Sequence, residues 1–128
     1  MGTKVLIVDD DPLMHKLYQH HLERAGFQVV TAANGMEGLE LAQREIPQVI
    51  VMDMMMPEMD GLSALRELRR YDTTKSIPVI MITANAEYYT FKKEAEYSGA
   101  AVFLTKPFSP AKLITEVNRV ISGQNPAA

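Results

Sequence analysis

The sequence contains no cysteine among its 128 residues. Disulfide bonds, thiolate nucleophiles and cysteine-based metal sites are therefore excluded. It also lacks a hydrophobic stretch approaching the roughly 20 residues that span a bilayer, and residues 1–4 lead into a strand-like segment without the features of a signal peptide. These absences lead us to expect a cytoplasmic protein without a membrane anchor.

A surplus of basic charge is missing too, since the formal net charge is −3 at pH 7. Domains that bind nucleic acids normally carry a basic patch. The basic residues that do gather, Arg66, Arg69 and Arg70, are typical of a solvent-exposed helix face. We therefore expect no direct binding to nucleic acid.

What the sequence does contain is the composition of one globular domain. Hydrophobic residues make up 47% and charged residues 23% of the chain, which is ordinary for such domains. A chain of this length is large enough for one hydrophobic core. We assign residues 1–122 to a single domain and residues 123–128 to a tail or truncated linker.

Strand-like and helix-like segments alternate along the chain. Hydrophobic runs bounded by Pro, Gly or polar residues predict strands at residues 4–8, 27–32, 49–53, 77–82 and 101–105. Helical patterns predict helices at residues 13–25, 36–42, 62–71, 86–98 and 110–121. Continuous rather than alternating hydrophobic strands indicate a parallel sheet covered on both faces. The predicted fold class is therefore α/β, a (βα)5 doubly wound parallel sheet.

Polar side chains that suit chemistry follow these strands. Asp9 and Asp10 come after the first strand, Asp53 ends the third, Thr83 follows the fourth and Lys106 follows the fifth. Right-handed crossovers bring all these strand ends to one edge of the sheet. Carboxylates packed there repel one another unless a cation lies among them, and hard oxygen ligands without His or Cys suit Mg²⁺. An aspartate beside Mg²⁺ can attack phosphorus, with the hydroxyl and the ammonium holding the transferred group.

Four motifs in this order resemble the receiver domain of bacterial response regulators, and the resemblance covers residues 4 to about 121. The motifs are Val8-Asp9-Asp10, Met52-Asp53 with Pro57-Glu58-Met59-Asp60-Gly61, Thr83-Ala84, and Lys106-Pro107-Phe108. The resemblance is to the chemotaxis-regulator type. It implies a flavodoxin-like sheet with the strand order 2-1-3-4-5.

The resemblance also implies a phosphorylation and metal site. Asp53 would be the phospho-acceptor. Asp10, Asp53 and the backbone carbonyl of Met55 would bind Mg²⁺ directly, whereas Asp9 would act through a water molecule. These roles make aspartyl phosphate the expected chemical product.

A second group of residues is implied to bind and report the phosphoryl group. Lys106 and the backbone of Ala84 would contact phosphoryl oxygens. Thr83 would move toward the phosphate, and the ring of Phe103 would turn inward behind it. The peptide bond between Lys106 and Pro107 is expected to be cis.

The implied function is signal transduction in a two-component system. A sensor histidine kinase or a phosphotransfer protein would donate the phosphoryl group, and the domain would assist this reaction without being a turnover enzyme. Phosphorylation would switch the face made by the fourth helix, the fifth strand and the fifth helix. That face would control a downstream protein or a missing output domain, with the chain a monomer or a dimer through the same face.

Some positions depart from the family pattern. Phe103 stands where many members have Tyr, so we expect the ring position to depend less on phosphorylation. Met55 cannot orient a water molecule for attack on the phosphoryl group, although Asn85 can, and we expect slow decay of the phosphorylated form. The segment 83–99 is one residue longer than expected, and its aromatic residues either form a partner surface or pack against the sheet: Tyr88, Tyr89, Phe91 and Tyr97.

Two other functions compete with this interpretation. Phosphohydrolases of the haloacid dehalogenase type also use an acidic motif, then a hydroxyl, then a lysine, and Asp9 would be their nucleophile here. In that case Asp53 would have no role, and no acidic pair follows Lys106. A pseudo-receiver that only binds a partner usually lacks an acidic or lysine position, whereas this sequence has all of them.

Other polar and methionine residues have structural interpretations. Asp11 and Asp60 fit helix starts. The three histidines, His15, His20 and His21, lack the spacing of a helical metal pair, so we expect solvated or core histidines. Met52 and the run 54–56 are expected to fill the core and the following loop.

Overall fold

A computed structural model describes residues 3–56, 59–84 and 99–123. Its five-stranded parallel sheet has the order β2-β1-β3-β4-β5, which confirms the predicted fold. The strands are β1 (Lys4–Val8), β2 (Gln28–Ala32), β3 (Val49–Asp53), β4 (Val79–Ala84) and β5 (Val102–Lys106); the described helices are α1 (Pro12–Arg24), α2 (Gly35–Glu45), α3 (Gly61–Leu68) and α5 (Pro110–Ile121). The helix expected at 86–98, Asn85 and tail residues 124–128 lie outside the described residues. No helix in the described ranges is long and apolar enough to cross a membrane.

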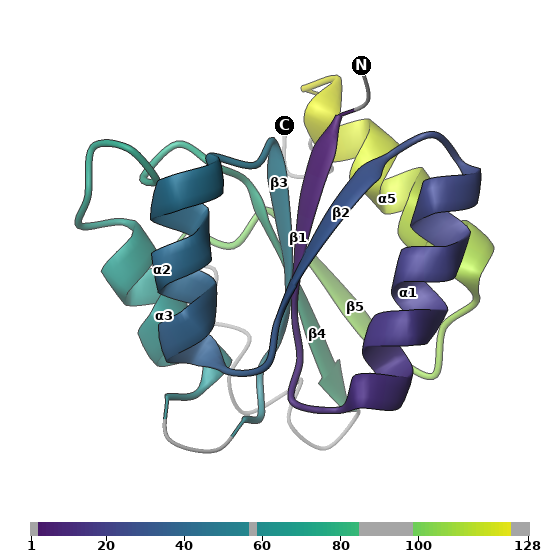
Figure 1. Ribbon diagram of the computed structural model, residues 1–128, viewed down its shortest axis with the longest axis horizontal. Helices are drawn as coiled ribbons and strands as arrows, with labels where there is room; N and C mark the ends of the chain where they lie inside the picture. Colours follow the sequence, from purple (N-terminus) through teal and green to yellow (C-terminus); the bar gives the residue numbers. More distant parts are fainter. Residues whose placement is uncertain (1–2, 57–58, 85–98, 124–128) are drawn as a thin grey trace.

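Helices cover both faces of the sheet, α1 and α5 on one side and α2 and α3 on the other (Figure 1). Alternate strand residues point to opposite faces. Ile7 and Val51 pack in the core beneath α1 and α5, while Val8 and Met52 pack in the core beneath α2 and α3. Each such fully buried side chain contributes roughly 1.5–3 kcal/mol. This two-sided burial explains why the strands read as continuous hydrophobic runs.

Four side chains cap the described helices at their first turns. Backbone N–H groups donate to Asp11 before α1, Asn34 before α2, Asp60 before α3 and Ser109 before α5, over 2.9, 2.9, 2.7 and 3.1 Å. Each cap stabilises its helix by about 1 kcal/mol. The structural interpretation of Asp11 and Asp60 is confirmed.

The strands β4 and β5 end later than predicted. We predicted 77–82 and 101–105, but the ladder pairs Thr83 with Thr105 and Ala84 with Lys106. Backbone hydrogen bonds between parallel strands do not require hydrophobic side chains. The hydrophobic pattern therefore placed the ends of β4 and β5 too early. Thr83 and Lys106 therefore lie within the sheet rather than after it.

The helix α3 ends earlier than predicted, at Leu68 instead of near residue 71. The hydroxyl of Thr74 donates to the carbonyl of Leu68 over 2.6 Å. The chain then turns back toward β4. A side chain that bonds to the helix end from the following loop is not visible in the hydrophobic spacing.

Arg69 stabilises the turn between α3 and β4 through hydrogen bonds to backbone carbonyls. Its guanidinium donates to the carbonyls of Thr74, Lys75 and Ile77 over 3.4, 3.0 and 2.9 Å, and to the carbonyl of Gly99 over 2.9 Å. Burial lowers the pKa of Arg69, although a guanidinium stays protonated in proteins. The prediction of a solvent-exposed basic face is therefore wrong for this residue. Arg69 connects α3, the loop before β4 and the approach to β5.

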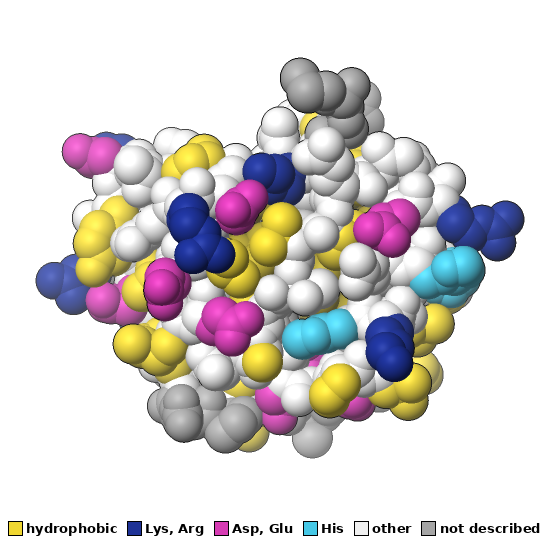
Figure 2. Space-filling view, viewed as in Figure 1, with side chains coloured by type: hydrophobic (Ala, Val, Ile, Leu, Met, Phe, Trp, Pro, Cys, Tyr) yellow, Lys and Arg dark blue, Asp and Glu magenta, His cyan; other side chains and the backbone are white. Residues whose placement is uncertain are grey.

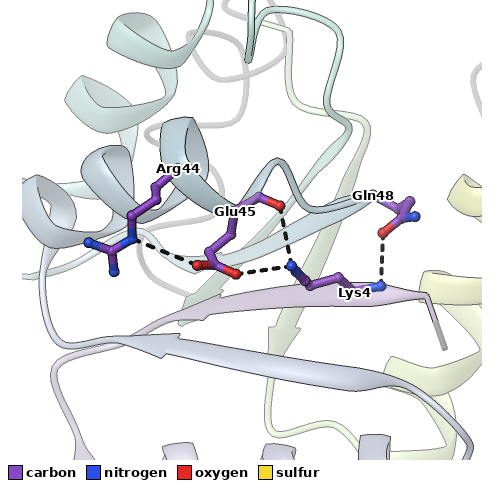
Figure 3. A network of polar contacts seen from close by, with 4 residues as sticks. All are labelled: Lys4, Arg44, Glu45 and Gln48. Atoms are coloured by element: carbon purple, nitrogen blue, oxygen red, sulfur yellow. Dashed lines mark hydrogen bonds and ion pairs between the residues drawn. The ribbon is translucent and has the colours of Figure 1, made fainter. Parts of the chain in front are cut away.

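A network of polar contacts lies at the amino end of the sheet, where Lys4 begins β1 and Gln48 precedes β3 (Figure 3). The ammonium of Lys4 lies 2.9 Å from the Glu45 carboxylate, and the backbone N–H of Lys4 donates to the Gln48 side chain over 2.8 Å. Arg44 lies 3.7 Å from the other Glu45 oxygen. Hydrogen bonding and the charge of Lys4 lower the pKa of Glu45, which keeps it ionised. The polar groups of this network thus satisfy one another.

The Arg69 contacts predict a clear stability difference between neighbouring arginines. We expect Arg69→Met to lower the free energy of unfolding by about 2–3 kcal/mol, because carbonyl groups lose a charged donor. The matched control is Arg70→Met. Arg70 is exposed and pairs with Glu67 on the surface, so its replacement should cost less than about 1 kcal/mol. Urea unfolding of both variants tests this, and equal losses would contradict the connecting role of Arg69.

Candidate functional site

Three aspartates meet at the carboxyl edge of the sheet, which lies at the bottom of Figure 1. Val8 pairs with Met52, so the residues that follow, Asp9 and Asp53, lie on neighbouring strand ends. One carboxylate oxygen from each of Asp9, Asp10 and Asp53 lies within 4.8 Å of the others. Asp9 and Asp53 are buried, while Asp10 is exposed. In the space-filling view, acidic and hydrophobic side chains lie side by side along this lower edge (Figure 2).

Asp9 is buried, and one of its carboxylate oxygens is left without a partner among the described residues. Its Oδ1 accepts the Asp11 N–H over 2.9 Å, but its buried Oδ2 has no hydrogen-bond partner among the described residues. Burial raises the pKa of Asp9; the Asp11 N–H opposes this rise, and the charge of Asp53 adds to it. A buried, unpaired carboxylate oxygen is costly unless a cation or a donor reaches it. The hard oxygens of this cluster fit a divalent cation such as Mg²⁺.

Each carboxylate oxygen of Asp53 contacts a positively charged or hydrogen-bond donating group. Its Oδ2 lies 3.2 Å from the ammonium of Lys106, and its Oδ1 accepts the backbone N–H of Met55 over 3.1 Å. Lys106 comes from β5, so the ion pair spans β4. The structure thus brings together four of the predicted charged residues, Asp9, Asp10, Asp53 and Lys106.

The residues expected to report phosphorylation, Thr83 and Phe103, lie on β4, which neighbours the strand that carries Asp53, and on β5. Thr83 is fully buried in β4, between the strands that carry Asp53 and Lys106. Phe103 is half-buried and packs against the core beneath α2 and α3. The peptide bond between Lys106 and Pro107 is cis. The backbone of Ala84 pairs with Lys106 at the end of the β4–β5 ladder.

Gly61 fixes the loop that follows Asp53. Its N–H donates to the Met54 carbonyl over 2.8 Å. A Cβ at this position would lie 2.5 Å from the carbonyl oxygen of Asp53 and 2.8 Å from the Cα of Met54. Only glycine permits this approach of α3 to the end of β3. Of the methionines predicted to fill the core and this loop, Met52 and Met54 are buried and Met56 packs partly buried against the core. The prediction is wrong for Met55, whose side chain is exposed.

Two residues of α1 contact the site, and sequence reasoning missed both. A ring nitrogen of His15 contacts the backbone carbonyl of Asp9. Tyr18 stacks on Phe108 with ring centroids 5.9 Å apart, and it lines a cavity of about 260 Å³ beside Lys106. Burial and the charges of Asp9 and Asp53 raise the pKa of Tyr18, which keeps its hydroxyl neutral. The sequence did contain a signal for these two residues. His15 and Tyr18 are three positions apart in the helix that follows the acidic motif, so they lie on one face of α1.

The chain matches a known protein family over most of its length. The family model described as response regulator receiver domain matches residues 5–118. The alkaline phosphatase synthesis transcriptional regulatory protein PhoP of Bacillus subtilis (strain 168) is 37% identical over 128 residues, which are 100% of this chain and 52% of PhoP. The transcriptional regulatory protein SrrA of Staphylococcus aureus (strain NCTC 8325 / PS 47) is 38% identical over 121 residues, 94% of this chain and 48% of SrrA. The chain thus spans about half the length of these curated relatives.

Solved structures show the same similarity. The chemotaxis response regulator CheY4 of Vibrio cholerae has a TM-score of 0.87 and 36% identity, covering 94% of this chain and 99% of CheY4. The receiver domain of sensor histidine kinase PA1611 from Pseudomonas aeruginosa PAO1 has a TM-score of 0.87 and 31% identity, covering 95% of this chain and 99% of that domain. That structure has a magnesium ion coordinated in its active site cleft.

The raised pKa of Asp9 predicts a pH-dependent stability penalty in the metal-free chain. The folded state holds this proton more tightly than the unfolded chain, so stability falls as the pH rises through the pKa of folded Asp9. We expect Asp9→Asn to raise the melting temperature at neutral pH in the presence of a chelator. The gain should shrink below about pH 4, where Asp9 is neutral in both states.

The matched control is Asp10→Asn, which changes an exposed carboxylate of the same cluster. Its effect on the melting temperature should be smaller, because solvent screens the charge. Thermal unfolding followed by circular dichroism measures both variants across the pH range. A lower melting temperature of Asp9→Asn at neutral pH would contradict the penalty.

Proposed function

Because the chain belongs to the response regulator receiver domain family, the signalling modules of two-component systems, we propose that it accepts a phosphoryl group on Asp53 in a Mg²⁺-dependent reaction. The observation that carries this proposal is the position of Asp53. Its carboxylate lies 3.2 Å from the Lys106 ammonium and within the cluster that Asp9 and Asp10 complete. A carboxylate with a cation on one side and a metal site on the other suits attack on phosphorus.

The acidic cluster would hold the metal ion. The carboxylates of Asp10 and Asp53 and the backbone carbonyl of Met55 would be direct ligands, and Asp9 would act through a water molecule. The unpaired Asp9 oxygen supports this assignment. When bound, Mg²⁺ supplies positive charge that reduces the repulsion between the carboxylate and the incoming phosphoryl group.

The residues of the chain would then share the transfer. An oxygen of Asp53 forms the new bond to phosphorus while the bond between phosphorus and the donor breaks. The ammonium of Lys106 exchanges its contact with Asp53 for a phosphoryl oxygen. The hydroxyl of Thr83 and the backbone N–H of Ala84 bind further oxygens. The domain thereby assists its own phosphorylation, and it is a signalling module rather than a turnover enzyme.

Phosphorylation would act as the switch. The phosphoryl group adds about −1.5 to −2 units of charge and strong acceptor oxygens. Contacts of Thr83 and Lys106 that exist only in the phosphorylated form favour one of two states of the face that includes β5 and α5. Because Phe103 already packs inward and lacks a hydroxyl, its ring would move less than a Tyr at this position.

The partners follow from the family. Receiver domains interact with histidine kinases and with downstream output domains. The donor for this chain would be a sensor histidine kinase or a phosphotransfer protein in the cytoplasm. The recipient would be a downstream protein or an output domain, since the relatives PhoP and SrrA are about twice as long as this chain. The chain would act as a monomer or as a dimer through the switching face.

Incubation with acetyl phosphate or beryllofluoride and Mg²⁺ tests the phospho-acceptor. We expect mass spectrometry to find one phosphoryl group on the wild-type chain after acetyl phosphate, and none on Asp53→Asn. The matched control is Asp60→Asn, since asparagine also caps helices and Asp60 should not accept the phosphoryl group. Catalytic phosphate release that Asp9→Asn abolishes would indicate a phosphohydrolase instead. No response to either reagent would indicate a binding module.

The exposed Met55 side chain predicts a long-lived phosphorylated form. It is 52% exposed beside Asp53 and has no group that positions a water molecule for attack. We expect the isolated phosphorylated chain to lose its phosphoryl group slowly after the phosphoryl donor is removed. Met55→Gln should speed this hydrolysis. Quantification of the phosphorylated fraction by mass spectrometry measures both rates. A half-life of seconds for the wild-type chain would contradict this expectation.

A further inference from the structure

The backbone carbonyl of Asp9 depends on a side chain of α1 for its hydrogen bond. A ring nitrogen, Nε2 of half-buried His15, contacts this carbonyl oxygen. A carbonyl only accepts hydrogen bonds, so Nε2 must carry the proton. The contact therefore connects the first turn of α1 to the end of β1.

The backbone of α1 cannot supply this hydrogen bond. Asp9 precedes the N-cap Asp11, whose carbonyl accepts the first helical bond from the His15 N–H, so the Asp9 carbonyl lies outside the hydrogen-bond pattern of the helix. Pro12 has no N–H, and the N–H of Leu13 donates to the Asp11 cap over 2.9 Å. The ring of His15 thus supplies a hydrogen bond that neither of these two residues gives to the Asp9 carbonyl.

The remaining polar atoms of Asp9 are also held, with one exception. Its N–H donates to the Ala32 carbonyl of β2 over 3.1 Å, and its Oδ1 accepts the Asp11 N–H. Its Oδ2 is buried and has no partner in the part of the chain that the structure describes. Asp9 is therefore fixed from β2, from the α1 cap and from His15, which leaves a single oxygen for a ligand.

We propose that His15 is a positioning residue of the metal site. By holding the Asp9 carbonyl, it fixes the backbone from which the Asp9 carboxylate extends, and it keeps Oδ2 available beside Asp10 and Asp53. This role rests on the proposed Mg²⁺-dependent function. It assigns His15 a part in metal binding through Asp9, without direct contact with the metal.

The test compares His15→Leu, which removes the donor at similar size, with His15→Gln, whose amide nitrogen donates to the same carbonyl. Isothermal titration calorimetry with MgCl₂, well below each melting temperature, gives the dissociation constant. We expect His15→Leu to bind Mg²⁺ roughly tenfold more weakly and His15→Gln to recover most of the affinity. His20→Leu on the exposed part of the same helix is the control and should bind like the wild type.

A second measurement uses the metal-free chain. Long-range ¹H–¹⁵N NMR spectra should show the His15 ring protonated at Nε2. The amide signal of Asp11, which reports its bond to the Asp9 carboxylate, should shift in His15→Leu and stay near its wild-type position in His15→Gln. Both signals are recorded without metal and without phosphorylation, so they can be read even if the chain binds no Mg²⁺.

The outcomes separate the two proposals. Equal Mg²⁺ affinity of His15→Leu and the wild type, or equal weakening in both His15 variants, would overturn the positioning role. A His15 ring protonated only at Nδ1 would also overturn it. Absence of Mg²⁺ binding in the wild type would overturn the proposed function, and the ring and amide signals would still show whether His15 holds Asp9.

Discussion

Repulsion among carboxylates at one sheet edge is the constraint on which the site depends. Asp9, Asp10 and Asp53 each place an oxygen within 4.8 Å of the others. Lys106 and backbone N–H groups compensate part of this charge, yet burial still raises the pKa of Asp9. The folded chain therefore keeps an unfavourable arrangement that a cation or a proton relieves. Stability and cation binding are coupled through the same atoms.

The two edges of the sheet handle charge in opposite ways. At the amino edge, Lys4 pairs with Glu45, whose pKa falls because its charge is satisfied. At the carboxyl edge, Asp9 has a raised pKa and an oxygen without a partner among the described residues. Similar residue types thus stabilise the fold at one edge and leave binding capacity at the other. This contrast marks the carboxyl edge as the candidate binding site without reference to any relative.

Much of the fold could be predicted because it depends on side-chain type and spacing. The hydrophobic runs, the caps at Asp11 and Asp60 and the charged residues at strand ends all led to correct elements. The errors share another cause. Arg69 and His15 bind backbone carbonyls, and every residue carries such an acceptor, so the sequence does not reveal which carbonyl a side chain will reach. The carboxyl ends of β4 and β5 were predicted too early for the same reason, since backbone hydrogen bonds between strands leave no pattern in the side chains.

The helix α1 connects the two halves of the charge cluster. His15 contacts the Asp9 carbonyl, and Tyr18, one turn later on the same face, stacks on Phe108 beside Lys106 and Pro107. The acidic side and the lysine side of the site thus both contact the same helix. A displacement of α1 relative to the sheet would act both on the Asp9 backbone and on the segment that follows Lys106, where Phe108 stacks on Tyr18. The packing of α1 therefore bears on the backbone at both the acidic and the lysine side of the site.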